Sequence, residues 1–176
     1  MSSSTDERNA EFGEYVAARW PRLVRAAVLL GCSAHEAEDV TQTALTRCLV
    51  KWRQVRRADD RDAYVYRVLV NTFTDGRRRR WNAERPTETV PEGPAVAVPD
   101  GTDDLVLRDS VERALDNLTR DQRVAVVLRY YLNQTEVQMA ETLRVAPGTV
   151  KSRLSRALAA MAVDPELSDH ETRRGA

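Results

Sequence analysis

The stretch APGTVKSRL, residues 146–154, opens with alanine, proline and glycine and then turns basic. No acidic residue occurs between Glu141 and Asp164, although 31% of the chain is charged. At about 100° per residue, the small, hydroxyl and cationic side chains fall on one side of a helix, opposite an apolar stripe. Such a face suits the DNA major groove, where small residues allow close approach and cations meet phosphates. A solvated surface helix has the same pattern, so the preceding segment decides between the two interpretations.

The segment before this stretch predicts the first half of a helix-turn-helix. Thr135 and Gln138 form a capping-box pattern that begins a short helix with Val137 and Ala140 on its inner side. Three residues, RVA, separate that helix from Pro147, which suits a first helical turn because its missing N–H has no intrahelical partner there. Two helices joined by so short a turn favour a DNA-binding helix-turn-helix.

Helical periodicity extends over most of the chain, and no segment alternates like a strand. Pro21 is expected to start or kink the first helix, and the pairs Ser33/Glu36 and Thr119/Gln122 are further capping boxes. The positions expected to face a core are Leu23, Ala26, Ala27 and Leu30; Ala37, Val40, Ala44, Leu45, Cys48 and Trp52; Val65, Val68, Leu69 and Thr72; Val111, Ala114, Leu115 and Leu118; Val124, Val127, Leu128 and Tyr131; Leu143; and Val150, Leu154, Ala157, Leu158 and Met161. The fold class predicted is all-α.

A proline-rich acidic segment, which includes RPTETVPEGPAVAVPDGTDD (85–104), divides the chain. The sequence predicts a helical domain over 10–84, a flexible linker over 85–108, a second helical domain over 109–163 and a disordered tail over 164–176. The formal net charge of zero hides a block pattern: +4 over residues 1–85, −5 over 86–110, +3 over 111–163 and −2 over 164–176. Because two basic blocks lie on either side of an acidic connector, the net charge of zero does not exclude nucleic acid as a partner.

Several classes of function lack support in the sequence. Cys32 and His35 have a C-x-x-H spacing, but no second ligand pair follows, so neither a metal nor another cofactor is predicted. No apolar run is long enough to cross a membrane, and the polar N-terminus predicts no signal peptide, so a cytoplasmic protein is expected. No nucleophile–base set or phosphate-binding glycine loop appears, so an enzyme is not expected.

The first domain has a basic segment of its own, DGRRRRW (75–81). On the expected helix, Tyr64, Arg67, Asn71 and Arg78 share the face opposite the apolar stripe. Aromatic residues beside cations suit single-stranded nucleic acid, because bases stack on the rings while cations follow the backbone. Tyr64 could equally border the core, and the spacing alone does not separate these alternatives.

The chain resembles the group IV, or extracytoplasmic-function, sigma factors of bacterial RNA polymerase, of an actinobacterial type. The resemblance is carried by AHEAEDVTQTAL, YVYRVLVNTFTDGRRRRW, LTRDQRVAVVLRYYLNQTEVQMAETL and APGTVKSRLSRA, and it covers most of residues 11–162. It implies a region 2-like domain that binds the clamp helices of the largest polymerase subunit and opens the −10 element. It also implies a region 4-like helix-turn-helix domain that reads the −35 element and rests on the flap of the second-largest subunit.

The resemblance also implies roles for individual residues. Polymerase-binding positions are Glu38, Asp39, Gln42 and Arg47. Positions for −10 binding and opening are Arg56, Arg57, Asp60, Tyr64, Arg67, Asn71, Arg77, Arg78, Arg79, Arg80 and Trp81, and the loop 53–62 falls where the family holds a flipped base. Positions for −35 binding are Thr149, Lys151, Ser152, Arg153, Ser155 and Arg156.

Three residues depart from the family pattern. Thr43 replaces the usual acid after the clamp-helix glutamine, and Tyr64 replaces a tryptophan. Ala146 stands where relatives cap the recognition helix with serine or threonine, which gives up about 1 kcal/mol. An anti-sigma factor is a candidate partner. The alternative function is a dimeric helix-turn-helix regulator that binds duplex DNA without opening it, and such a regulator would have no use for the VNTFTDGRRRRW segment.

Overall fold

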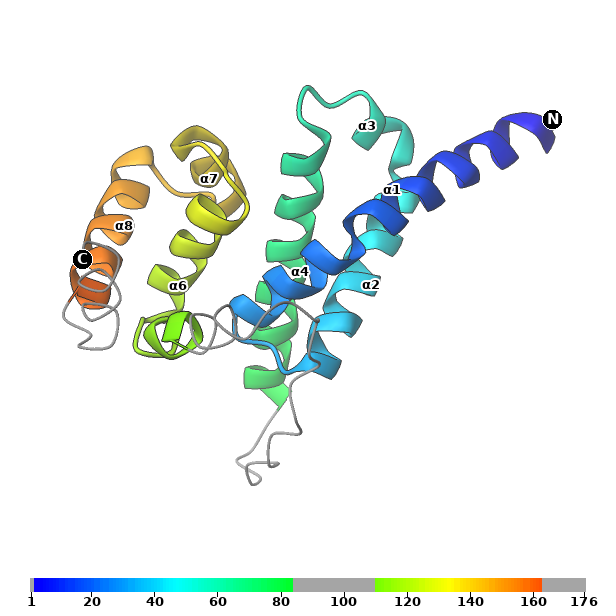
Figure 1. Cartoon of the computed structure of the whole chain (residues 1–176). Helices are drawn as coiled ribbons and strands as arrows, with labels where there is room; N and C mark the ends of the chain where they lie inside the picture. The colour runs from blue at the N-terminus through cyan, green and yellow to red at the C-terminus, as the bar shows by residue number, and fades with distance from the viewer. Residues whose placement is uncertain (1, 84–109, 163–176) are drawn as a thin grey trace, which may run out of the picture. The chain divides into compact units, whose positions relative to one another are not determined.

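The computed structural model describes residues 2–83 and 110–162, and within them the side chains of 6–77 and 110–162. The described chain is helical and forms two compact units. The first is built mainly from residues before 84, and the second from residues after 109 together with the short segment 29–31 (Figure 1). The expected all-α class and the two-domain organisation are confirmed. The expected linker 85–108 lies almost wholly outside the described residues, as does the expected tail 164–176.

The first domain contains α1 (Ser2–Leu29), α2 (Ala34–Val50), the short α3 (Trp52–Arg56) and α4 (Arg61–Ala83). α2 packs along α4, and α1 lies beside them (Figure 1). The capping box predicted before α2 is present: the Ser33 hydroxyl accepts a hydrogen bond from the Glu36 N–H, and the Glu36 carboxylate accepts one from the Ser33 N–H. Pro21 lies inside α1 and does not start it, so that half of the expectation is wrong.

The core of the first domain follows the predicted periodicity closely. The buried apolar side chains include Leu23, Ala26, Ala27, Leu30, Ala37, Ala44, Leu45, Cys48, Trp52, Val65 and Leu69, whereas Val40 and Val68 are only half-buried. Trp52 is 1% exposed and belongs to α3, after the end of α2. Its indole meets Phe12 edge to face, with ring centroids 5.1 Å apart, and Tyr15 at 5.4 Å. The tryptophan therefore anchors α3 to the N-terminal half of α1.

The second domain contains a helix over residues 110–116, then α6 (Arg120–Val126), the π-helical turn η1 (Val127–Tyr131), α7 (Glu136–Leu143) and α8 (Pro147–Ala162). Capping boxes begin α6 at Thr119 and α7 at Thr135, as predicted. The π-helical turn was not predicted; within it the Leu132 N–H donates to the Val127 carbonyl at 3.0 Å. α6 and α7 both pack against α8.

Two of the residues expected to face the core of the second domain are exposed. Val137 is 64% exposed and Leu158 is 45% exposed, while Val150, Leu154 and Ala157 are buried as expected. α7 has only two turns, and it buries Met139 where the sequence placed Val137 inside. The orientation of so short a helix is set by the turns at its ends and by the packing against α8, more than by its own apolar pattern.

Candidate nucleic-acid interface

The C-terminal helix α8 carries the first candidate surface. α7 ends at Leu143 and α8 begins at Pro147, so the three-residue turn is present as predicted. Arg144 turns the chain with a left-handed backbone (φ 54°), and the Ala146 carbonyl accepts hydrogen bonds from the N–H groups of Thr149 and Val150. Val150 is fully buried, which fixes how α8 rotates against the domain. The opposite face of α8 is left for solvent or DNA.

The six predicted −35 residues are not equally free on this face. Lys151, Ser155 and Arg156 are exposed, whereas Thr149, Ser152 and Arg153 are half-buried. Arg153 reaches back to Asp121 at 2.5 Å, and its side chain is only 23% exposed. Lys151 lies 3.7 Å from Glu136, with 69% of its side chain exposed. Arg156 has no ion pair with any described residue and is the freest cation of the set.

The helix α4 of the first domain carries the second candidate surface. The Arg67 guanidinium lies over the Tyr64 ring, 4.9 Å from its centroid, and Asn71 is half-buried further along the helix. Arg77 lies 5.6 Å from the centroid of Phe73. Stacked cation and ring form a flat, positively charged surface on which a base could rest. The side chains of Arg78, Arg79, Arg80 and Trp81 lie outside the described residues.

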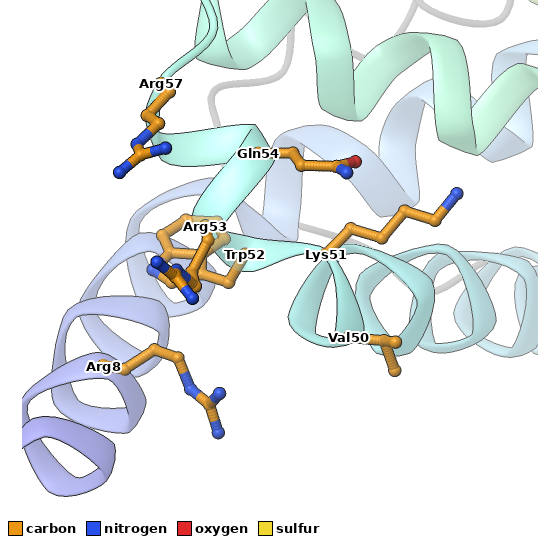
Figure 2. Close-up of a pocket in the computed structure, with 7 residues that line it drawn as sticks. All are labelled: Arg8, Val50, Lys51, Trp52, Arg53, Gln54 and Arg57. Atoms are coloured by element: carbon orange, nitrogen blue, oxygen red, sulfur yellow. The ribbon is translucent and has the colours of Figure 1, made fainter.

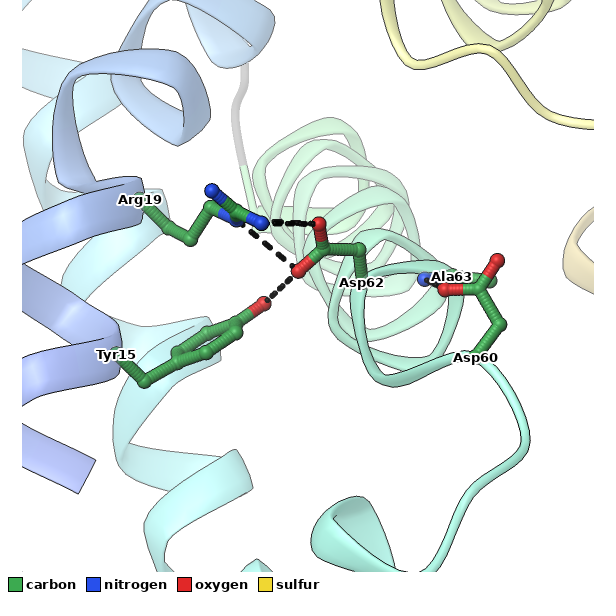
Figure 3. Close-up of polar contacts among 5 residues, drawn as sticks. All are labelled: Tyr15, Arg19, Asp60, Asp62 and Ala63. Atoms are coloured by element: carbon green, nitrogen blue, oxygen red, sulfur yellow. Dashed lines mark hydrogen bonds and ion pairs between the residues drawn. The ribbon is translucent and has the colours of Figure 1, made fainter. Parts of the chain in front are cut away.

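The stretch 53–62, which was expected to be a loop, contains the three remaining predicted −10 residues. In the structure only 57–60 form a loop, because 53–56 belong to α3 and α4 begins at Arg61. Asp60 accepts a hydrogen bond from the Ala63 N–H at 2.8 Å, which caps the start of α4 (Figure 3). Arg56 forms an ion pair with Glu11 of α1 at 3.1 Å, whereas Arg57 is exposed and has no ion pair with any described residue. Asp60 thus has a local structural role, and Arg56 is already held by α1.

A polar cluster from α1 holds the start of α4, and the sequence did not predict it. The Tyr15 hydroxyl donates to Asp62 at 2.8 Å, and the Arg19 guanidinium binds the same carboxylate at 3.0 to 3.2 Å (Figure 3). Burial, together with the hydrogen bond to Asp62, raises the pKa of Tyr15 above its usual range. The phenol therefore stays protonated and remains a donor.

The same face of α1 also reaches the loop through Glu11. This carboxylate pairs with Arg56 at 3.1 Å and with Arg61 at 3.4 Å, and the Arg61 guanidinium lies over the Trp52 ring at 5.4 Å. Glu11, Tyr15 and Arg19 are spaced by four residues, which puts them on one face of a helix. The four-residue spacing was the only sign in the sequence that these three side chains act together. Their partners lie more than forty residues later, so the local sequence could not identify them.

The predicted polymerase-binding residues lie along α2. Glu38, Asp39 and Gln42 are exposed, and Asp39 lies 3.6 Å from His35. Arg47 instead turns toward α4, where it donates to the Thr72 hydroxyl at 3.0 Å and lies 4.0 Å from Asp75. Arg47 therefore also links two helices of the domain.

The described residues contain no cluster of three or more His, Cys, Asp or Glu side chains placed to hold a metal ion. Cys32 and Cys48 are both buried free thiols, and burial raises the pKa of Cys48 to about 11. Among the described helices, none combines the length and the apolar character needed to cross a membrane.

The two domains match two family models in the order in which they occur. Residues 16–83 match sigma-70 region 2, and residues 108–161 match sigma-70 region 4. The chain therefore contains two modules of sigma-70-type factors, region 2 and region 4.

Relatives over the full length define the family more narrowly. The chain is 39% identical to the RNA polymerase sigma-E factor of Streptomyces coelicolor, over 85% of this chain and 82% of that protein. It is 37% identical to the sigma-E factor of Streptomyces avermitilis, over 93% and 89%. It is 31% identical to the ECF RNA polymerase sigma factor SigL of Mycobacterium tuberculosis, over 86% and 85%. The chain belongs to the extracytoplasmic-function family of RNA polymerase sigma factors, with relatives among actinobacteria.

Two solved structures have the same fold. The sigma factor RpoE, crystallised with the anti-sigma factor NepR from Bartonella quintana, matches with a TM-score of 0.67 and 26% identity, over 88% of this chain and 98% of that one. CnrH, in complex with the cytosolic domain of CnrY, matches with a TM-score of 0.58 and 22% identity, over 88% and 86%, which supports the fold alone.

Proposed function

We propose that this sigma factor directs core RNA polymerase to specific promoters and opens the −10 element for transcription initiation. The observation that carries the proposal is the combination of two surfaces in one chain. α8 presents an exposed cation, Arg156, on a helix-turn-helix, and α4 presents the stacked pair Tyr64 and Arg67. The first suits duplex DNA, and the second suits separated strands.

The proposed division of labour follows the two domains, with boundaries at 10–84 and 109–163. In the second domain, Lys151, Ser152, Ser155 and Arg156 would contact the −35 element, with Thr149 at the helix start. Arg153 would act mainly by holding α8 against α6 through Asp121, because that ion pair occupies its guanidinium. In the first domain, Tyr64, Arg67 and Asn71 would receive the unpaired −10 strand, and the basic run 77–80 would follow its phosphates.

The exposed face of α2 is proposed to bind the clamp helices of the largest polymerase subunit. Glu38, Asp39 and Gln42 offer polar groups on this face without a buried role. The second domain would rest on the flap of the second-largest subunit, and the chain between the domains would cross the polymerase. Polymerase would then hold both domains at a fixed spacing, so that weak contacts act together.

We further propose an anti-sigma factor as a regulatory partner, because the related RpoE was crystallised with the anti-sigma factor NepR. The protein would act without catalysis of its own, as a binding subunit in the cytoplasm, where RNA polymerase transcribes. An excess of a partner that covers the polymerase-binding face of α2 would block transcription by competition.

Run-off transcription on a promoter library, with and without core polymerase, tests the proposal. The holoenzyme should form a stable opened complex in which unpaired thymines near −10 react with permanganate. The free protein should bind the same promoter poorly at physiological salt, because few cations meet the DNA and unstacking costs a few kcal/mol per step. Tight, specific duplex binding by a free dimer, without strand opening, would contradict the proposal and favour an ordinary regulator.

A further inference from the structure

A pocket of about 370 Å³ lies in the first domain, at the junction of α2 and α3 and beside the N-terminal part of α1. Figure 2 shows Arg8 coming from α1, while the remaining lining residues come from one continuous segment at the end of α2 and through α3. The lining residues are Arg8, Val50, Lys51, Trp52, Arg53, Gln54 and Arg57. Four of them are cationic and none is acidic, so the pocket concentrates positive charge.

This positive charge is not neutralised within the described part of the chain. The nearby Arg56 and Arg61 both pair with Glu11. By contrast, none of the four cations that line the pocket has an ion pair with a described residue, although Lys51, Arg53 and Arg57 are exposed. Unneutralised cations that line one pocket attract an anion.

Two residues that line the pocket also carry a buried donor without an acceptor. The indole Nε1 of Trp52 has no hydrogen-bond partner although this residue is only 1% exposed, and the Nε of Arg8 is likewise buried without a partner. Buried N–H groups in native proteins almost always have a hydrogen-bond acceptor. A buried N–H group without one therefore needs an explanation, such as a bound ion.

We propose that this pocket binds a backbone phosphate of the single-stranded promoter DNA. A phosphate offers several acceptor oxygens to the arginine and lysine side chains that line the pocket, and a base is a poorer fit because the Trp52 ring is buried and cannot stack. The inference rests on the proposed function and adds α1, through Arg8, and the α2–α3 junction to the DNA path.

The position of Arg57 favours DNA over an acidic peptide as the occupant. Arg57 lines the pocket and also begins the loop 57–60 between α3 and α4, within the stretch 53–62 that the resemblance predicts to hold a flipped −10 base. A strand held by that loop must continue past it, and its next phosphate would then meet Arg53, which precedes Arg57 by about one helical turn. The pocket would therefore fix the register of the strand without reading its sequence, as phosphate contacts do.

The test uses the full-length chain in holoenzyme and a labelled single-stranded oligonucleotide that carries the −10 element. Each phosphate in turn is replaced by a neutral methylphosphonate, and affinity is measured for wild type, Arg53→Gln and the charge-retaining Arg53→Lys. Arg22→Gln, an exposed arginine on α1 that does not line the pocket, is the matched control. Circular dichroism checks that each variant is folded, and pull-down checks that it assembles with core polymerase.

In wild type, we expect one or two adjacent substitutions to weaken binding about tenfold, which corresponds to about 1.4 kcal/mol. Arg53→Gln should weaken binding of the unmodified strand similarly and become insensitive at those same positions, while Arg53→Lys and Arg22→Gln keep the wild-type pattern. The slope of log affinity against log salt should fall by about 0.7 for the lost contact.

Two results would overturn the inference while leaving the proposed function intact. One is an unchanged methylphosphonate pattern in Arg53→Gln with normal −10 binding. The other is a defect in polymerase assembly without a defect in DNA binding, which would assign the pocket to a protein partner. A wild-type holoenzyme that does not prefer the −10 strand to a scrambled one would instead reject the proposed function, and the inference with it.

Discussion

The two domains hold their proposed DNA-binding helices by different means. In the second domain, α8 is positioned by neighbours that are close in sequence: the three-residue turn after α7 and the capping boxes at Thr119 and Thr135. In the first domain, the loop and the start of α4 are held by Glu11, Tyr15 and Arg19 of α1, across more than forty residues of sequence. Local signals thus specify one surface, and long-range polar contacts specify the other.

The largest expected effect concerns the packing of α8. Val150→Asp places a charge at a fully buried position without a partner, and we expect a loss of about 3–5 kcal/mol, enough to unfold the second domain. Thermal denaturation followed by circular dichroism should show the second domain lost while the first still unfolds cooperatively. The matched control is Val137→Asp, since Val137 is 64% exposed in the same domain; equal damage from both variants would contradict the assigned packing.

The next effect separates the two arginines of α8. Arg156→Ala should cost about 1–3 kcal/mol of −35-dependent promoter binding, the value of one good base contact, and should leave stability unchanged. Arg153→Ala should instead lose the ion pair with Asp121, worth about 0.2–1 kcal/mol of stability at a largely exposed partner. Run-off transcription on promoters with intact and scrambled −35 elements measures the first effect. If the two variants exchange these phenotypes, the orientation of α8 on DNA is wrong.

Breaking the contact between α1 and α4 should have a comparable but smaller effect. Asp62→Asn weakens the bonds from Tyr15 and Arg19, and we expect a loss of about 1–2 kcal/mol because the site is partly exposed. Permanganate reactivity at −10 should fall more than polymerase binding does, since the loop and α4 lose their support. Asp59→Asn, at an exposed neighbouring position, serves as the control and should match wild type in both assays.

Removing one helix cap and adding another within the helix-turn-helix should change the free energy of unfolding in opposite directions. Thr135→Ala removes the hydroxyl that accepts from the Gln138 N–H and should cost about 1 kcal/mol. Ala146→Ser adds a side-chain acceptor before α8 and should gain a similar amount, because Ala146 precedes the first helical residue, Pro147. Urea denaturation of the two variants gives both values. If Thr135→Ala loses no stability and Ala146→Ser gains none, then turn geometry, and not capping, limits the stability of the helix-turn-helix.

The smallest expected effect is a change in alkaline stability. The pKa of Tyr15 is raised in the folded protein, so the unfolded chain releases this proton first, near pH 10. Stability therefore falls as pH rises through about 10. Tyr15→Phe should show a shallower fall than wild type, although Tyr66, whose pKa is also raised by burial, still contributes. Tyr130→Phe, at a residue that is 56% exposed, should keep the wild-type slope.

What the sequence determined by itself is the part of the protein that depends on local chemistry. It predicted the all-α class, three capping boxes, the buried stripes of α2, α4 and α8, and the three-residue turn, because each follows from residues within one or two helical turns. It also predicted the family from four motifs, and the two domain matches together with the sigma-factor relatives confirm it.

Only the tertiary structure decided which of these residues are free to act. In the folded protein Arg153 pairs with Asp121, and Val137 is exposed. α1 continues past Pro21, and Tyr15 and Arg19 both bind Asp62. The tertiary structure also brought Arg8 to the pocket lined by Arg53 and Arg57. The physical reason is that the sequence pattern of a helix determines which face of the helix a side chain lies on. The partner that a long polar side chain binds depends instead on which groups lie near it in the folded protein. Those neighbours exist only once the helices have packed.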